Sequence, residues 1–299
     1  MQTLLDEIRR HLPEGENARR LFHGRGHCFP GYADLVIDAY PPLVMVMLYR
    51  EREAAWLEGL VELLLGLPQP PQAILLQERF RKNAPSRLLY GVLPEELDAL
   101  EAGLRFRLRL GEAQNVGFFP DMAVGRQLVC ERAAGKKVLN LFSYSCSFSV
   151  AALAGGAEQV VNLDMNRGAL ELGKLNHRLN ELDTRRASFL ALEFFRSRSK
   201  LRKLGPFDLV ICDPPASQGN SFTAERHWPK LVRSLPGLVA PGGEILACHN
   251  APTLGPAYLD GLFAEQLPGA ELIGRLLPGD DFPEVDSDAG LSLHHYRVA

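Results

Sequence analysis

The stretch Asp213-Pro214-Pro215 has the residue types best suited to chemistry on a planar substrate. It follows the apolar run FDLVIC (207–212), which the pattern predicts as a buried strand. Prolines cannot continue a ladder of backbone hydrogen bonds, so they form a rigid loop after the strand. That loop would hold a carboxylate and free carbonyl oxygens able to accept hydrogen bonds from an amino group on a base. Alternatively, the three residues have only a structural role and form a rigid end to the strand.

Asp164 ends another predicted strand, 159–165, and Asn140 lies at the end of a third, 137–142. An acid at the end of the second strand of a dinucleotide-type fold is placed to accept hydrogen bonds from two ribose hydroxyls. Alternatively, Asp164 is the N-cap of the predicted helix 167–180. The sequence contains no GxGxxG motif that would cradle a pyrophosphate. The pattern therefore favours a nucleoside cofactor without phosphates, of which S-adenosylmethionine is one.

These positions require a sheet whose strands end at a common edge. Residues 113–299 alternate predicted strands with helical patterns, which predicts βαβ units and a parallel sheet covered on both faces. Two further predicted strands, 271–277 and 291–298, form a closing antiparallel hairpin. The expected fold class is α/β, a Rossmann-like and mostly parallel sheet. The parallel strands are expected at 137–142, 159–165, 187–192, 207–212 and 244–249.

Residues 1–112 are expected to form a small α+β domain that contributes to substrate or RNA binding. Its predicted elements are strands 33–38, 43–49, 73–77 and 104–110 and a helix at 52–67. The last strand reads LRFRLRL and alternates strictly. It is therefore expected to bury its apolar face and to present Arg105, Arg107 and Arg109 on the other.

Bulk properties exclude several classes of protein. The 299 residues are 46% hydrophobic and 23% charged with a net charge of −3, which excludes a disordered chain and a uniformly basic nucleic-acid binder. The apolar stretches are too short or too interrupted by charge to span a bilayer, and the first residues do not read as a signal peptide. The five cysteines (28, 130, 146, 212, 248) form no CxxC pair. A cytoplasmic location without a membrane partner is expected.

Charge is unevenly distributed along the chain. Residues 185–203 hold seven basic side chains against one acid, whereas 280–288 is rich in acids. The basic stretch is either a solvated helix face or an edge that contacts phosphates. His23, His27 and Cys28 match no common zinc spacing, so no metal is expected. No motif sets an oligomeric state, which stays unknown.

Taken together, the motifs resemble those of the class I S-adenosylmethionine-dependent methyltransferases. Within that class the sequence is similar to the RlmI/RlmK-type 23S ribosomal RNA methyltransferase family, over roughly residues 18–299. A further segment, GFFPDMAVGR (117–126), is similar to the part of that family that leads into its catalytic domain. The motifs that carry the resemblance are NLFSY (140–144), GGAEQVVNLDMNRGALELGKLNHRLN (155–180), FDLVICDPPAS (207–217) and PGGEIL (241–246).

The resemblance implies a site for S-adenosyl-L-methionine and a role for each residue. Asp164 would bind the ribose hydroxyls, Met165 would pack on the adenine, and Glu193 would lie near the adenine amino group. Asp213 and Pro214 would face the target base as catalytic residues. The implied cofactor-binding residues are Phe119, Asp121, Asn140, Phe142, Ser143, Asp164, Met165, Glu193 and Asp213.

The resemblance further implies methyl transfer to a base of ribosomal RNA. In cytosine-directed members a cysteine stands where this sequence has Asn250, and Cys248 is expected in the core. We therefore expect methylation of a nitrogen, on a purine. A protein or small-molecule substrate stays open because of the acidic net charge. A cofactor-binding protein with little catalysis also stays open, because Ala123, Cys146 and Ala216 depart from the family's usual arginine, glycine and aromatic residue.

Overall fold

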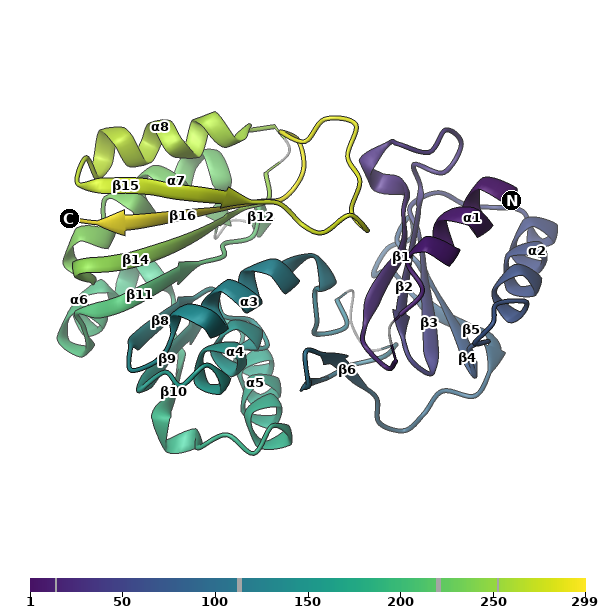
Figure 1. The fold of residues 1–299 in the computed structure, drawn as a ribbon, viewed down its shortest axis with the longest axis horizontal. Coiled ribbons are helices and arrows are strands. Elements are labelled where there is room, and N and C mark those ends of the chain that lie inside the picture. The colour runs from purple at the N-terminus through teal and green to yellow at the C-terminus, as the bar shows by residue number, and fades with distance from the viewer. Residues whose placement is uncertain (14, 112–114, 219–221, 252) are drawn as a thin grey trace. The chain divides into compact units, whose positions relative to one another are not determined.

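The computed structural model describes every residue except 14, 112–114, 219–221 and 252. The chain forms two compact units (Figure 1). Unit 1 comprises Met1–Asp121 and Gly279–Val285, and unit 2 comprises Met122–Pro278 and Asp286–Ala299. The boundary expected between residues 112 and 113 lies outside the described residues. No helix among the described residues is long and apolar enough to cross a membrane.

Unit 1 is built on a five-stranded sheet in the order β1-β2-β3-β4-β5, in which only β3 and β4 are parallel. Helix α2 connects these two strands, and α2 and α1 cover the same face of the sheet. A separate hairpin, β6–β7, follows. The elements are α1 (Gln2–Arg10), β1 (Arg19–His23), β2 (Leu35–Tyr40), β3 (Leu43–Leu48), α2 (Ala54–Leu65), β4 (Ala73–Glu78), β5 (Ser86–Gly91), β6 (Asp98–Glu101) and β7 (Leu104–Arg107).

A segment from the other end of the chain completes unit 1. Glu284 lies 3.2 Å from His23 Nε2, and the guanidinium of Arg20 lies 4.6 Å from the centre of the Phe282 ring. Gly26 has no room for a side chain, because a Cβ there would lie 1.8 Å from the carbonyl oxygen of Pro283. Part of the acidic C-terminal stretch is thus used in packing and ion pairing inside this unit.

The expected arginine face of residues 104–110 is only partly present. The strand is shorter than expected and ends at Arg107. Arg107 is half-buried, with ion pairs of 2.6 Å to Asp98 and 2.7 Å to Glu96. The expectation that Arg107 is available for RNA is therefore wrong, because the neighbouring strand and the segment before it supply carboxylates that neutralise it.

Unit 2 contains the expected Rossmann-like sheet, which confirms the predicted fold class. Its seven strands run in the order β10-β9-β8-β11-β14-β16-β15. The first five are mutually parallel, and β16 pairs antiparallel with both neighbours as the closing hairpin. The strands are β8 (Lys137–Leu141), β9 (Gln159–Asp164), β10 (Ala187–Ala191), β11 (Phe207–Cys212), β14 (Val239–His249), β15 (Ala270–Leu276) and β16 (Ser292–Val298).

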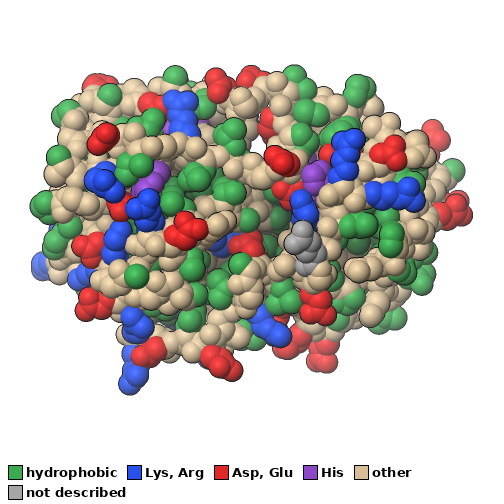
Figure 2. All heavy atoms as spheres, viewed as in Figure 1, with side chains coloured by type: hydrophobic (Ala, Val, Ile, Leu, Met, Phe, Trp, Pro, Cys, Tyr) green, Lys and Arg blue, Asp and Glu red, His purple; other side chains and the backbone are tan. Residues whose placement is uncertain are grey.

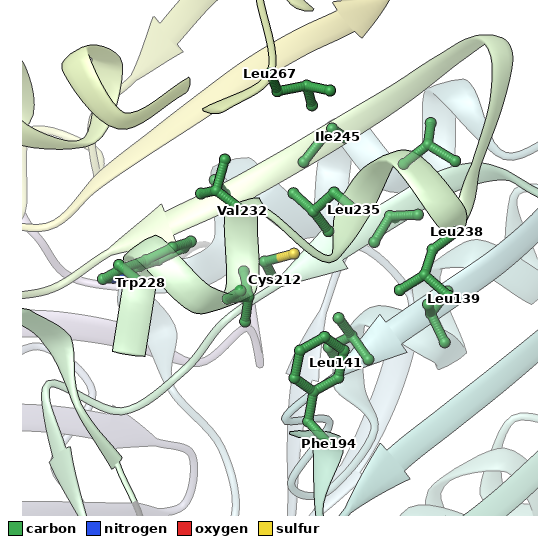
Figure 3. Packing of buried hydrophobic residues seen from close by; sticks show 14 of the residues in the cluster. Leu139, Leu141, Phe194, Cys212, Trp228, Val232, Leu235, Leu238, Ile245 and Leu267 are labelled. Carbon is green, nitrogen blue, oxygen red and sulfur yellow. The ribbon is translucent and has the colours of Figure 1, made fainter. Parts of the chain in front are cut away.

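Helices cover both faces of this sheet because its strands are apolar on both sides. Val138 and Val160 face the α3–α4 side, whereas Leu139 and Val161 face the side of α6, α7 and α8. Figure 3 shows the second of these cores, where Trp228 and Val232 of α7 pack over Cys212. The helices are α3 (Ala123–Arg132), α4 (Ser147–Ala154), α5 (Arg167–Leu179), α6 (Phe194–Leu204), α7 (Ala224–Val232) and α8 (Pro256–Gln266).

Candidate functional site

The sheet of unit 2 reverses its strand order between β8 and β11. The chain moves outward from β8 through β9 to β10 and then returns to place β11 on the other side of β8. Ligands of open α/β sheets bind at such a switch point, beyond the carboxyl ends of the strands. Here the backbone N–H of Asp213 lies 3.5 Å from the carbonyl oxygen of Leu141. The structure thus brings the loop after β11 next to the loop after β8.

The loop after β8 is a tight turn with unusual backbone angles. Phe142, Tyr144 and Cys146 have φ values of 57°, 44° and 60°, in the left-handed region that favours glycine. Room for the Cys146 side chain comes from Gly173 of α5, since a Cβ there would lie 2.4 Å from the Cys146 sulfur. The cysteine that replaces the family's usual glycine is accommodated by a glycine on the neighbouring helix.

Asp164 connects this loop to the end of β9. One carboxylate oxygen accepts the backbone N–H of Tyr144 at 2.8 Å, and the other accepts that of Asn166 at 2.7 Å. The N-cap of α5 is Asn166, whose side chain accepts the N–H of Ala169 at 3.0 Å. Asp164 is therefore not the helix cap, and its half-buried carboxylate stands at the carboxyl edge of the sheet with its orientation set by two amides.

A chain of buried hydrogen bonds sets the orientation of Asn140. Its amide donates to Asn162 Oδ1 at 3.0 Å, and Asn162 donates in turn to Ser149 Oγ at 3.0 Å. Ser149 lies 2.9 Å from His177 Nε2, and His177 Nδ1 lies 2.7 Å from the carbonyl oxygen of Gly173. Because that carbonyl only accepts, His177 carries its proton on Nδ1 and accepts the Ser149 hydroxyl proton on Nε2. Burial lowers the pKa of His177, so the ring stays neutral.

The same chain leaves one acceptor unused. Among the described residues, Asn140 Oδ1 is buried and has no hydrogen-bond partner. Such an atom is costly unless a ligand or water supplies a donor. Ser143, which the sequence also assigned to the cofactor, is buried in the adjacent turn, and its backbone N–H donates to the carbonyl oxygen of Leu163 at 3.0 Å.

Other predicted residues lie at the same edge with different surroundings. Met165 follows Asp164 and is 52% exposed. Glu193 is the N-cap of α6, where its two oxygens accept the N–H groups of Phe195 and Arg196, each at 2.8 Å. Phe142 packs edge-on against the buried ring of Phe222 at 5.4 Å. Pro214 is buried, and Asp213 beside it is half-buried.

Phe119 and Asp121 belong to unit 1. Phe119 is 39% exposed, and both residues line a hollow of that unit together with Arg20 and Tyr40. Their assignment to the cofactor stays a prediction.

The thiols near the switch point are inaccessible to solvent. Cys212 immediately precedes Asp213, and Cys146 lies in the loop after β8; both are fully buried. Burial, with the nearby carboxylates Asp213 and Asp164 respectively, raises the pKa of each thiol. Cys248 of β14 is also fully buried, on the α3–α4 side of the sheet.

A hollow of about 450 Å³ lies between α6 and α7. The sequence predicted only part of its lining. Phe195 and His227 contribute rings whose centres are 5.6 Å apart. Within the described part of the chain, its three cations form no ion pair. The lining residues are Phe195, Arg198, His227, Lys230 and Arg233. The sequence signalled the basic run of α6 but not the α7 side chains, which lie far along the chain.

A parallel sheet that gathers a carboxylate, a tight loop and an Asp-Pro-Pro turn at its switch point defines an α/β protein that binds a nucleoside-containing ligand. Comparison with known proteins makes this specific. Residues 19–297 match the family model of the S-adenosylmethionine-dependent methyltransferases, so the chain belongs to that family. The recognition from sequence, including the cofactor, is confirmed.

Individual relatives agree with this assignment. Ribosomal RNA large subunit methyltransferase K/L of Shewanella sp. strain MR-4 is 32% identical over 256 residues, covering 79% of this chain and 35% of the relative. The protein of the same name from Shewanella amazonensis is 32% identical over 286 residues, covering 89% and 39%. The chain thus spans little more than a third of these relatives. The crystal structure of SMU.776 complexed with SAH superposes with a TM-score of 0.89 at 25% identity, covering 99% of this chain and 80% of that one.

The residues at the switch point fit S-adenosylmethionine. Asn140 Oδ1 is a buried acceptor that requires a donor, and the ammonium group of the methionine part is one. The carboxylate of Asp164 can accept from ribose hydroxyls, and the exposed Met165 offers an apolar surface for the adenine. The absence of a pyrophosphate-binding glycine motif agrees with a cofactor that carries no phosphate.

Proposed function

We propose that this chain transfers a methyl group to a nitrogen of a base in RNA, and that the RNA is ribosomal. The observation that carries the proposal is the position of Asp213 and Pro214, at the switch point and directly beside the cofactor loop. The names of the curated relatives support a ribosomal RNA substrate. Such a substrate would place the chain in the cytoplasm.

When bound, S-adenosylmethionine supplies a methyl group that its sulfonium already activates for direct displacement. The protein therefore mainly positions the substrate and excludes water. The Asp213 carboxylate and the Pro214 carbonyl can accept N–H groups of a base and so orient the nitrogen lone pair. Since the base edge must reach the end of β11, it has to be flipped out of a helix or already unpaired.

The buried cysteines favour nitrogen over carbon as the target. Methylation of carbon 5 of a pyrimidine requires a thiolate that first attacks carbon 6. Cys212 and Cys248 are both 0% exposed, and burial raises the pKa of Cys212. By the family resemblance of the sequence, Asn250 stands where cytosine-directed members would carry a cysteine. A nitrogen with its own lone pair needs no such activation.

A local cationic surface supports RNA as the substrate. Acidic and basic side chains are interspersed on the face shown in Figure 2, so phosphates must be bound by particular patches. The hollow between α6 and α7 is one such patch, with three cations and two aromatic rings. The basic run of α6 is a second candidate patch, and it shares Arg198 with the hollow. Changing Arg196, Arg198, Lys200 and Arg202 of this run to glutamine should flatten the dependence of log Kd for RNA on log salt, by roughly 0.7 for each phosphate that is no longer neutralised. An unchanged slope would place the RNA-binding surface elsewhere, with Arg105 and Arg109 next to be tested.

The decisive experiment incubates the purified chain with methyl-labelled cofactor and separated RNA, protein and small-molecule fractions. Label is expected in RNA, and digestion to nucleosides should show it on a base nitrogen. Asp213→Ala should lose transfer, whereas Asp208→Ala should retain it. Asp208 is the matched control because it is the second residue of the same strand and accepts the Lys137 N–H at 2.8 Å, at the opposite edge of the sheet. Label in protein or small molecules would overturn the RNA assignment, and tight cofactor binding without transfer to any fraction would overturn the enzymatic one.

A further inference from the structure

Unit 1 contains a hollow of about 230 Å³, and apart from Phe119 and Asp121 its lining residues have no part in the proposed mechanism. Alternate residues of β2 and β3, such as Leu35 and Val46, face α1 and α2. The intervening residues therefore face the other side of the sheet. The floor of the hollow is formed by five of them, Val36, Asp38, Tyr40, Met45 and Met47. The hollow thus lies on the sheet face that the two helices leave uncovered.

Tyr49 lies at the hollow between two arginines. It is 37% exposed, and the guanidinium carbons of Arg25 and Arg79 lie 4.6 Å and 5.9 Å from its ring centre. The exposed ring of Phe119 lines the same hollow. Two exposed aromatic rings in one concave site indicate a ligand that stacks.

The charges of the hollow are arranged in two zones. Among the described residues, Arg25 and Arg79 form no ion pair, and Arg79 Nε is buried without a hydrogen-bond partner. Asp38, by contrast, is paired with Arg20 and accepts the Tyr40 hydroxyl at 3.3 Å. The described residues thus give the hollow two cations without ion pairs around Tyr49, whereas its two carboxylates, Asp38 and Asp121, both interact with Arg20.

His23 adds a neutral polar group to the floor side. Its Nδ1 lies 2.7 Å from Arg20 Nη1, which can only donate, so Nδ1 must be unprotonated. Burial, together with the charges of Arg20 and Arg25, lowers the pKa of His23 to about 3. A ligand with an uncharged ring and polar edges suits the side of the hollow near His23. An anionic group of the same ligand suits the side near Arg25 and Arg79. A single nucleotide combines the two.

We propose that this hollow binds one unpaired nucleotide of the RNA substrate, with its base stacked on Tyr49 and its phosphate held by Arg25 and Arg79. The inference rests on the proposed function, because it assumes that the substrate is RNA. Proteins that hold single-stranded RNA combine aromatic or arginine stacking surfaces with cations that follow the backbone. Arg25 and Arg79 can do both, since each already lies over an aromatic ring.

The test measures binding of the full-length chain to a fluorescein-labelled, mixed-sequence, single-stranded RNA of about twenty nucleotides, by fluorescence anisotropy over a series of salt concentrations. Tyr49→Ala should weaken binding about five- to hundred-fold, as expected when one base no longer stacks on an aromatic ring. It should leave the salt slope unchanged, and Tyr49→Phe should bind like wild type. The double variant Arg25→Gln/Arg79→Gln should reduce the slope by roughly 0.7, the value for the one phosphate that the pair holds.

Matched controls lie in the same unit. Tyr90 of β5 is 44% exposed but does not line the hollow, so Tyr90→Ala should bind RNA like wild type. Arg9 of α1 is exposed and also lies outside the hollow, so Arg9→Gln should leave the slope unchanged. A duplex of the same sequence should bind more weakly than the single strand, because its bases are already stacked.

Two outcomes separate this inference from the proposed function. If wild type labels RNA but Tyr49→Ala and Tyr90→Ala bind it equally well, the hollow is not a nucleotide site and the proposed function stands. If wild type transfers no label to RNA, the proposed function fails. Absence of any binding to the single strand by wild type overturns the inference.

Discussion

Replacement of Asp164 by alanine tests the cofactor site most directly. Its carboxylate accepts the Tyr144 N–H at 2.8 Å and the Asn166 N–H at 2.7 Å, and each oxygen has a further lone pair for a ribose hydroxyl. Two hydrogen bonds to a charged acceptor contribute on the order of 2–4 kcal/mol to binding. We therefore expect Kd for S-adenosylmethionine to rise roughly thirty- to several-hundred-fold.

The cost of this change to folding should be smaller than its cost to binding. The two amides lie at the edge of the sheet, where water can replace the missing acceptor, so about 1 kcal/mol of the free energy of unfolding is at stake. Asn166→Ala is the matched control, because it removes the cap of α5, worth about 1 kcal/mol, without removing an acceptor for ribose. Titration calorimetry and thermal unfolding separate the two effects. A folded Asp164→Ala protein with a near-normal Kd would refute the assignment.

Three further predictions follow from buried groups. Cys248→Ser should retain most methyl transfer, measured as turnover on RNA, and wild type should form no covalent adduct with 5-fluoropyrimidine RNA, because the thiol is fully buried. In the folded chain the pKa of His23 is about 3, whereas its ordinary value is 6.5. Between these two pH values the unfolded chain binds more protons than the folded one, so the free energy of unfolding should fall as the pH drops from 6.5 towards 3. Denaturant unfolding from pH 7 to pH 4 should show this loss, and His23→Gln should reduce it. Gly173→Ala should lower the free energy of unfolding by about 1–3 kcal/mol, because its Cβ would lie 2.4 Å from the Cys146 sulfur, and Cys146→Gly in the same chain should restore most of it in the same assay.

The sheet of unit 2 was predictable because its strands are buried on both faces. Each parallel strand is a short apolar run bounded by turn residues, and β8, β9, β10 and β11 lie within a residue or two of their expected positions. Unit 1 was less predictable. Strand β5 has only half-buried and exposed residues, without alternation, and β1 has only two apolar residues, so neither carries a clear hydrophobic period. The return of residues 279–285 to unit 1 depends on contacts such as Glu284 with His23, which no local pattern indicates.

The candidate site likewise contains residues that were predictable from the sequence and residues that were not. Asp164 and Asp213 were predictable, because the fold class makes the residue after each strand a candidate for ligand binding. The chain of hydrogen bonds behind Asn140 was not. Asn162, Ser149 and His177 come from one strand and two helices, and their pairing depends on how these elements pack. Sequence reasoning placed Asn140 in contact with the cofactor but could not show what orients it.

The Cys146–Gly173 contact bears on whether departures from a family pattern indicate loss of function. Taken alone, a cysteine at a position that favours glycine suggests a damaged cofactor loop. The structure shows the loop with a positive φ at Cys146 and with the Asp164 carboxylate bonded to the Tyr144 amide. The space that a glycine would leave at 146 is instead left by Gly173, so the volume is conserved across two elements rather than at one position. Because the compensation is three-dimensional, the departure at Cys146 does not favour a cofactor-binding protein without catalysis over an active methyltransferase.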